Sequence, residues 1–74
     1  MDLILLNSKI DEIKIPITTI AEKMGISRQT FYLTMRGQRE FKPSEIEKIC
    51  DILRLTDEEK SSIFSADRVE KSDN

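Results

Sequence analysis

The chain has 74 residues, with 12 basic and 14 acidic side chains and a formal net charge of −2, and this length corresponds to one small domain. It contains no histidine and a single cysteine, Cys50, which excludes a zinc site and an internal disulfide bond. No stretch of the chain approaches the roughly 18 apolar residues of a membrane span. We therefore expect a cytoplasmic protein with no cofactor, no metal ion, no small-molecule ligand and no membrane contact.

Two helices are predicted in the first third of the chain. In residues 2–13, apolar side chains recur at helical spacing, which indicates a helix that packs against a core. Residues 17–24 show the same kind of pattern, because apolar side chains stand at positions i, i+3, i+4 and i+7 of one helix face. These side chains are Ile17, Ile20, Ala21 and Met24.

A short turn and a third helix follow directly. Gly25 can adopt the left-handed conformation that ends a helix, and the Ser27 hydroxyl can cap the start of the next one. With only about three residues between them, the two helices must cross steeply. The helix predicted at 28–36 then has two distinct sides. Thr30, Phe31, Thr34 and Met35 share the side expected to face the core, and Arg28, Gln29, Tyr32, Leu33 and Arg36 share the other.

Two further helices are predicted at 45–54 and 57–64. The sequence Ser44-Glu45-Ile46-Glu47 has the spacing of a capping box, in which a hydroxyl and a carboxylate cap the same helix end, and an apolar stripe follows it. A second box is predicted at Thr56-Asp57-Glu58-Glu59. Residues 66–74 lose the apolar period and are expected to form a tail after a domain that spans residues 1–65. No alternation long enough for a β-sheet is present, so the fold class is all-α.

Charge is unevenly distributed along the chain. Residues 1–13, 14–42 and 43–74 carry one, six and five basic side chains against three, two and nine acidic ones, which gives −2, +4 and −4. The positive segment contains the two helices that are joined by the short turn. A local positive patch can contact DNA phosphates, while an acidic remainder keeps sequence-independent binding weak.

The outer side of the helix at 28–36 has the chemistry of a surface that reads DNA bases. An arginine such as Arg28 can donate two hydrogen bonds to guanine, and a glutamine such as Gln29 can pair in the same bidentate way with adenine. Leu33 offers an apolar contact to a thymine methyl group. Tyr32 completes the expected base-reading set and can also reach a phosphate.

A resemblance to known proteins is carried by the run AEKMGISRQTFYLTMRG, in which a small residue, a glycine and an apolar residue stand at Ala21, Gly25 and Phe31. This run resembles the helix-turn-helix of the Cro and repressor proteins of bacteriophages. The continuation REFKPSEIEKICDILRLTDEEKSSIFSADRVEK is similar to short Cro-like proteins of phages and prophages of low-GC Gram-positive bacteria. The resemblance covers nearly the whole chain. It implies a compact five-helix domain like that of lambda repressor, which binds a palindromic operator as a dimer.

The contacts to the DNA backbone are expected around the helix predicted at 28–36. The positions of Pro16 and Ile17 commonly hold a polar cap and a phosphate-contacting residue in the family, so a contact from the helix at 17–24 stays open. For a dimer seam, the helix at 57–64 and the tail offer apolar surface at Ile63, Phe64 and Val69, and the alternative is that at least half of this surface belongs to the core. Seven residues are the expected phosphate contacts: Lys14, Thr18, Ser27, Arg36, Gln38, Arg39 and Lys42.

Three classes of function are compatible with the sequence to different degrees. The leading hypothesis is a sequence-specific regulator of transcription that binds double-stranded operator DNA, in particular a Cro-like repressor of a phage or prophage. The alternative is a protein-interaction module, such as an antirepressor or an antitoxin-like partner, that uses Tyr32 and Leu33 on the same fold. An enzyme is not expected, because the chain has no histidine, no nucleophile-base pair and no glycine-rich phosphate loop.

Overall fold

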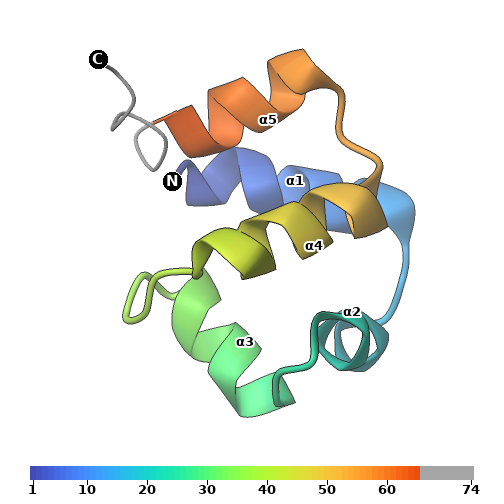
Figure 1. The fold of residues 1–74 in the computed structure, drawn as a ribbon. Helices are drawn as coiled ribbons and strands as arrows, with labels where there is room; N and C mark the ends of the chain where they lie inside the picture. Colours follow the sequence, from blue (N-terminus) through green and yellow to red (C-terminus); the bar gives the residue numbers. More distant parts are fainter. Residues whose placement is uncertain (66–74) are drawn as a thin grey trace.

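The computed structural model describes residues 1–65, which form five α-helices and no strand (Figure 1). They are α1 (Leu3–Ile13), α2 (Ile17–Met24), α3 (Arg28–Met35), α4 (Pro43–Leu53) and α5 (Asp57–Phe64). The predicted all-α fold with five helices is confirmed. The predicted tail at 66–74, with Val69, lies outside the described residues. None of the described helices has the length and apolar character needed to cross a membrane.

Helix α4 lies between α1 and the α2–α3 pair (Figure 1). It packs against both α1 and α2, while α3 packs on α2 and α5 packs on α1. In Figure 1, α2 and α3 lie below α4, and α5 lies above α1 at the opposite side of the molecule. The two-helix unit α2–α3 is therefore carried on one side of the domain, away from the acidic first turn of α5.

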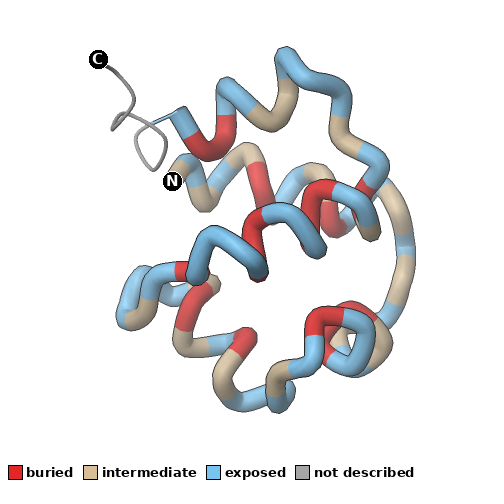
Figure 2. The backbone as a smooth tube through the Cα atoms, in the orientation of Figure 1, coloured by how far each residue is buried: buried red, intermediate tan, exposed pale blue. Residues whose placement is uncertain are grey.

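Apolar side chains from all five helices form a single core. Figure 2 marks buried positions in red on every helix. Each helix contributes one apolar side chain with no exposed surface, and burial of such side chains stabilises the packing of helices this short. These five side chains are Leu6, Ile20, Phe31, Ile49 and Phe64.

The start of α1 and the end of α5 are joined to each other. The Asp2 side chain caps α1 by accepting a hydrogen bond from the Leu5 N–H at 3.0 Å, and the Asp2 N–H donates to the Ile63 carbonyl at 2.8 Å. In this arrangement Ile63 and Phe64 are 1% and 0% exposed. The prediction that these two residues offer surface for a dimer seam is therefore wrong, and the alternative that they belong to the core is right, because both are buried in the core cluster and α5 packs on α1.

Helix α4 begins two residues earlier than predicted. Lys42 is the N-cap residue, Pro43 is the first helical residue, and the Glu45 carboxylate accepts a hydrogen bond from the Lys42 N–H at 2.9 Å. The predicted box from Ser44 to Glu47 is wrong. Proline has no N–H to satisfy and its fixed φ suits the first helical position, so the helix starts at Pro43 and Ser44 lies inside the first turn.

Candidate nucleic-acid interface

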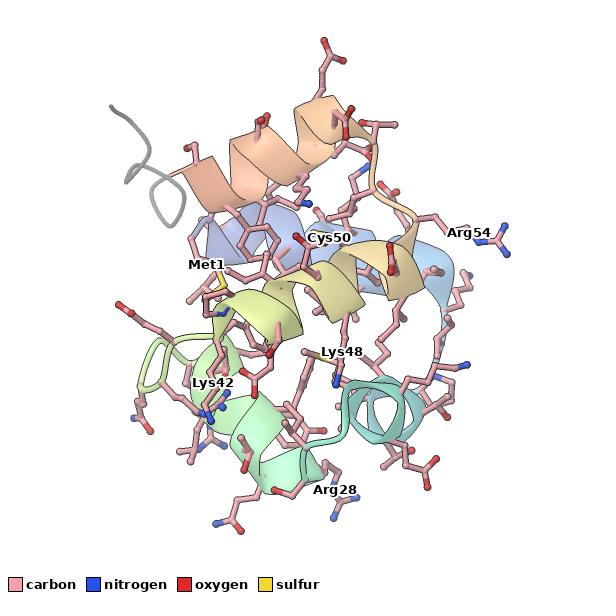
Figure 3. The ribbon with its side chains drawn as sticks, viewed as in Figure 1. Met1, Arg28, Lys42, Lys48, Cys50 and Arg54 are labelled. Carbon is pink, nitrogen blue, oxygen red and sulfur yellow. The ribbon has the colours of Figure 1, made fainter. Side chains whose placement is uncertain are left out.

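The turn between α2 and α3 is fixed by backbone hydrogen bonds and one hydroxyl. Gly25 has φ 76°, and the N–H groups of Gly25 and Ile26 donate to carbonyls of α2 at 3.0 and 3.1 Å, which is the pattern of a glycine-terminated helix. The Ser27 hydroxyl oxygen accepts from the Thr30 N–H at 3.0 Å and caps α3. Lys48 reaches from α4 to the Met24 carbonyl at 3.5 Å (Figure 3), so a cation also stabilises the end of α2.

The inner side of α3 is held firmly in the core. Phe31 and Thr34 have no exposed surface, and the Phe31 ring lies 6.3 Å from the Phe41 ring, centroid to centroid. Thr30 and Met35 on the same side are half-buried. The predicted division of this helix into an inner and an outer side is confirmed, since both completely buried residues of α3 belong to the predicted inner side.

The outer side of α3 is exposed to solvent over most of its length. Arg28, Gln29, Tyr32 and Arg36 are exposed and Leu33 is half-buried, and these five side chains together with Ser27 line one shallow hollow. Figure 3 shows Arg28 extending away from the body of the molecule at the start of α3. The structure thus brings the whole predicted base-reading set onto a single accessible surface.

Most of the predicted phosphate contacts lie around this surface, and one lies apart from it. Ser27 and Arg36 flank the ends of α3, and Gln38 and Lys42 are exposed in the loop that follows. Thr18 is exposed in the first turn of α2. Lys14, in contrast, is the C-cap residue of α1, and Figure 1 shows the C-terminal end of α1 beside that of α4, on the side of the molecule away from α3.

Arg39 is the predicted phosphate contact with the most unexpected surroundings. Its guanidinium donates from Nη1 to the Thr34 hydroxyl at 3.0 Å and from Nη2 to the Glu45 carboxylate at 2.9 Å. Burial raises the pKa of the Glu45 carboxyl, but the hydrogen bonds from Arg39 and from the Lys42 N–H outweigh this effect and lower that pKa below its ordinary value. Glu45 was missed as a site residue. The signal in the sequence is a polar residue, Thr34, at a core position of α3.

Two helices that cross at a three-residue turn, the second with a polar and cationic outer side, define a helix-turn-helix. Residues 15–63, more than half of the chain, match the family model described as a helix-turn-helix domain, and the chain belongs to this family of DNA-binding domains. Neither the comparison with curated proteins nor that with solved structures gave a significant match.

Within residues 1–65, no cluster of three or more His, Cys, Asp or Glu side chains has the geometry to hold a metal ion. Helix-turn-helix domains of this family are typically non-enzymatic. The outer surface of α3 is therefore the candidate functional site.

Proposed function

We propose that the protein is a sequence-specific regulator of transcription that reads double-stranded DNA with the outer side of α3. The observation that carries the proposal is the accessible, polar and cationic surface of Arg28, Gln29, Tyr32, Leu33 and Arg36 on a helix whose other side is fixed in the core. A helix of this width fits the major groove of B-DNA, where every base pair presents a distinct set of donors and acceptors.

The base contacts come from the first two turns of α3. Arg28 pairs with guanine and Gln29 with adenine, each through two hydrogen bonds, and Leu33 contacts a thymine methyl group. Tyr32, which is 41% exposed, lies between them and contacts a base edge or the adjoining phosphate. Neither the first turn of α3 nor its N-cap carries an acidic side chain that would repel the DNA.

The DNA backbone is contacted on both sides of α3. Pro16, the N-cap residue of α2, provides no side-chain cap, and the first turn of α2 has no acidic residue, so the N–H groups of Ile17 and Thr18 and the Thr18 hydroxyl can contact a phosphate oxygen. Beyond α3, Gln38 and Lys42 are exposed for the same purpose. These contacts position α3, and the base contacts give the sequence preference.

The protein acts on DNA as a symmetric dimer and belongs to the Cro-like repressors of phages and prophages, in the cytoplasm of the bacterial host. Two α3 helices about 34 Å apart would enter successive major grooves of an inverted repeat. The positive segment at 14–42 carries only +4, which limits the affinity of a single domain for DNA. A second half-site raises the affinity through effective concentration.

The experiment that tests this proposal is selection of duplexes from a random pool on the immobilised protein, followed by titration of the enriched duplex at several salt concentrations. We expect an enriched inverted repeat, a clear preference for it over random duplex, and an affinity that falls as salt rises. The matched control is the double variant Arg28→Ala/Gln29→Ala, which should enrich no sequence.

The outcome that contradicts the proposal is indifference of the folded protein to DNA at low salt. That result would support the alternative, a protein-interaction module in which the exposed Tyr32 and the neighbouring Leu33 contact another protein. Enrichment of a single asymmetric half-site, with one chain per duplex at saturation, would retain the DNA-binding function and exclude the dimer.

A further inference from the structure

A continuous chain of hydrogen bonds joins the backbone of α3 to the first turn of α4. The Thr34 hydroxyl donates to the Thr30 carbonyl at 3.1 Å and accepts from Arg39 Nη1 at 3.0 Å. Arg39 Nη2 donates to Glu45 Oε2 at 2.9 Å, and the Lys42 N–H donates to Glu45 Oε1 at 2.9 Å. One arginine and one carboxylate thus connect two helices and the loop between them.

We infer that Arg39 is a positioning residue, which bridges Thr34 and Glu45 and thereby fixes the loop at 36–42 so that Gln38 and Lys42 face the DNA backbone. This inference rests on the proposed function and assigns to Arg39 a role different from the phosphate contact expected from the sequence. The residues that touch DNA in this loop are its exposed ones.

The guanidinium of Arg39 is poorly available to DNA. The side chains of Arg39 and Glu45 are 25% and 9% exposed, and Thr34 is completely buried. Two of the five guanidinium N–H groups are used by Thr34 and Glu45, and to turn fully toward a phosphate Arg39 would have to leave a mostly buried carboxylate without its cation and a buried hydroxyl without its donor. Breaking a buried ion pair by removing one partner is strongly unfavourable, so the internal contacts hold Arg39 in place.

The loop alternates between inward and outward side chains. Arg39 and Phe41 point inward, where Phe41 is 7% exposed and packs against Phe31, whereas Gln38, Glu40 and Lys42 are exposed. Arg39 and Phe41 anchor the loop to the domain. Gln38, Glu40 and Lys42 therefore form its fixed, solvent-facing side.

The same chemistry occurs once more in the described part of the chain, at a place far from α3. Glu59 of α5 accepts a hydrogen bond from the Thr56 N–H at 2.9 Å and forms an ion pair with Lys9 of α1, as Glu45 does with the Lys42 N–H and Arg39. Both glutamates occupy the third position of their helices. Glu59→Ala is therefore a matched control for Glu45→Ala, with the same loss of charge and of a helix cap.

The experiment measures binding of a fluorescent duplex of random sequence to the folded variants Arg39→Ala, Glu45→Ala, their double variant, and the control Glu59→Ala. A positioning role predicts that Arg39→Ala and Glu45→Ala each weaken binding by about tenfold, equivalent to about one hydrogen bond to a charged group. The double variant should lose no more than either single one, because both changes break the same link. The control should bind as tightly as the wild type.

The sign of the Glu45→Ala effect is decisive. Removal of an acidic side chain near DNA favours binding by general electrostatics, so weaker binding has to come from the loss of loop position. If Arg39 contacted a phosphate itself, Glu45→Ala would free it and binding would be unchanged or tighter, which would overturn the inference. Absence of DNA binding by the wild type would instead overturn the proposed function.

A second pair of variants covers the case in which Arg39→Ala does not fold. Thr34→Val keeps the shape of the side chain and removes the hydroxyl, whereas Thr34→Ser keeps the hydroxyl. We expect Thr34→Val to weaken binding of the random duplex by several-fold, with binding retained by Thr34→Ser. Equal binding by the two folded variants would show that the link from Thr34 to Arg39 has no part in DNA binding.

Discussion

Helices α3 and α5 are built by the same local rules and lie on opposite sides of the domain. Each has eight residues, and each begins after a hydroxyl, Ser27 or Thr56, which accepts the N–H of the third helical residue at 3.0 or 3.1 Å. Each also buries an aromatic side chain completely, Phe31 in α3 and Phe64 in α5. The inner sides and the caps therefore do not distinguish the two helices.

The difference lies in the outer side of the first turn. In α5 this turn carries three acidic residues, Asp57, Glu58 and Glu59, which interact with the partial positive charge of the helix N-terminus and present negative charge to solvent. In α3 the matching turn begins with Arg28 and Gln29 and has no acidic residue. Of these two helices, only α3 has no acidic side chain in its first turn. The contrast teaches that the exposed residues, rather than the caps and the buried side, distinguish the helix proposed to read DNA.

The largest expected effect tests the feature that α3 and α5 share, a completely buried aromatic side chain. Phe31→Ala and Phe64→Ala should each lower the free energy of unfolding by about 3–5 kcal/mol, because each leaves a cavity in a small core. In a domain of ordinary marginal stability this is enough to unfold much of the protein. Urea unfolding followed by circular dichroism measures both. A tolerated substitution at either position would mean that the two inner sides are not equivalent.

The next largest effect, on the preference for the enriched duplex, distinguishes the outer side of α3 from that of α5. Arg28→Ala and Gln29→Ala should each cost about 1–3 kcal/mol in binding to the enriched duplex, with little change for random duplex. The matched substitutions at the first two positions of α5, Asp57→Ala and Glu58→Ala, should leave the preference for the enriched duplex unchanged. Competition titrations between the two duplexes measure the difference in binding free energy between them for each variant. Loss of preference in an α5 variant would remove the distinction.

A smaller effect is expected for single cations on the two sides of the molecule. Lys42→Ala should flatten the slope of log affinity against log salt by about 0.9, the value for one lost phosphate contact. Lys60→Ala should not change the slope, since Lys60 lies in α5 and pairs with Glu47 at 3.5 Å. Titration of a random duplex over a range of salt concentrations measures both slopes, and equal slopes for the two variants would contradict the assignment of Lys42.

The smallest effect concerns stability in acid. The hydrogen bonds from Lys9 and from the Thr56 N–H hold the pKa of Glu59 below its ordinary value. The unfolded chain then binds the proton more tightly, so the stabilisation is present above the unfolded pKa and disappears as the pH falls through the lowered pKa of the folded state. Glu59→Gln should lower the urea midpoint at neutral pH and leave it nearly unchanged at strongly acidic pH. A loss of equal size at both pH values would exclude this linkage.

Much of the fold was predictable because its signals are local. The bounds of α2 and α5 were predicted correctly from Gly25, which ends α2, and from the capping box at Thr56 and Glu59. The two sides of α3 follow from helical spacing alone, and Phe31 is buried as expected. Each of these features depends on residues within about one turn of one another, so the sequence contains the whole cause.

The features that were not predicted depend on residues far apart or on a choice between overlapping signals. Ser44 and Lys42 are both possible starts for α4, and the Pro43 ring decides in favour of Lys42. The burial of Phe64 depends on how α1 covers α5, which periodicity does not reveal. The inward direction of Arg39 likewise depends on the approach of Glu45 and Thr34 from two different helices.

The central claim, that the outer side of α3 reads bases in the major groove, is tested most directly by methylation interference on the enriched duplex. Methylation of guanine N7 blocks a major-groove acceptor, and methylation of adenine N3 blocks a minor-groove acceptor. We predict that N7 methylation of one guanine in each half-site prevents binding of the wild type, and that Arg28→Ala becomes indifferent to the same guanine. Interference at adenine N3 alone, or equal sensitivity of the wild type and Arg28→Ala at every guanine, would contradict the account.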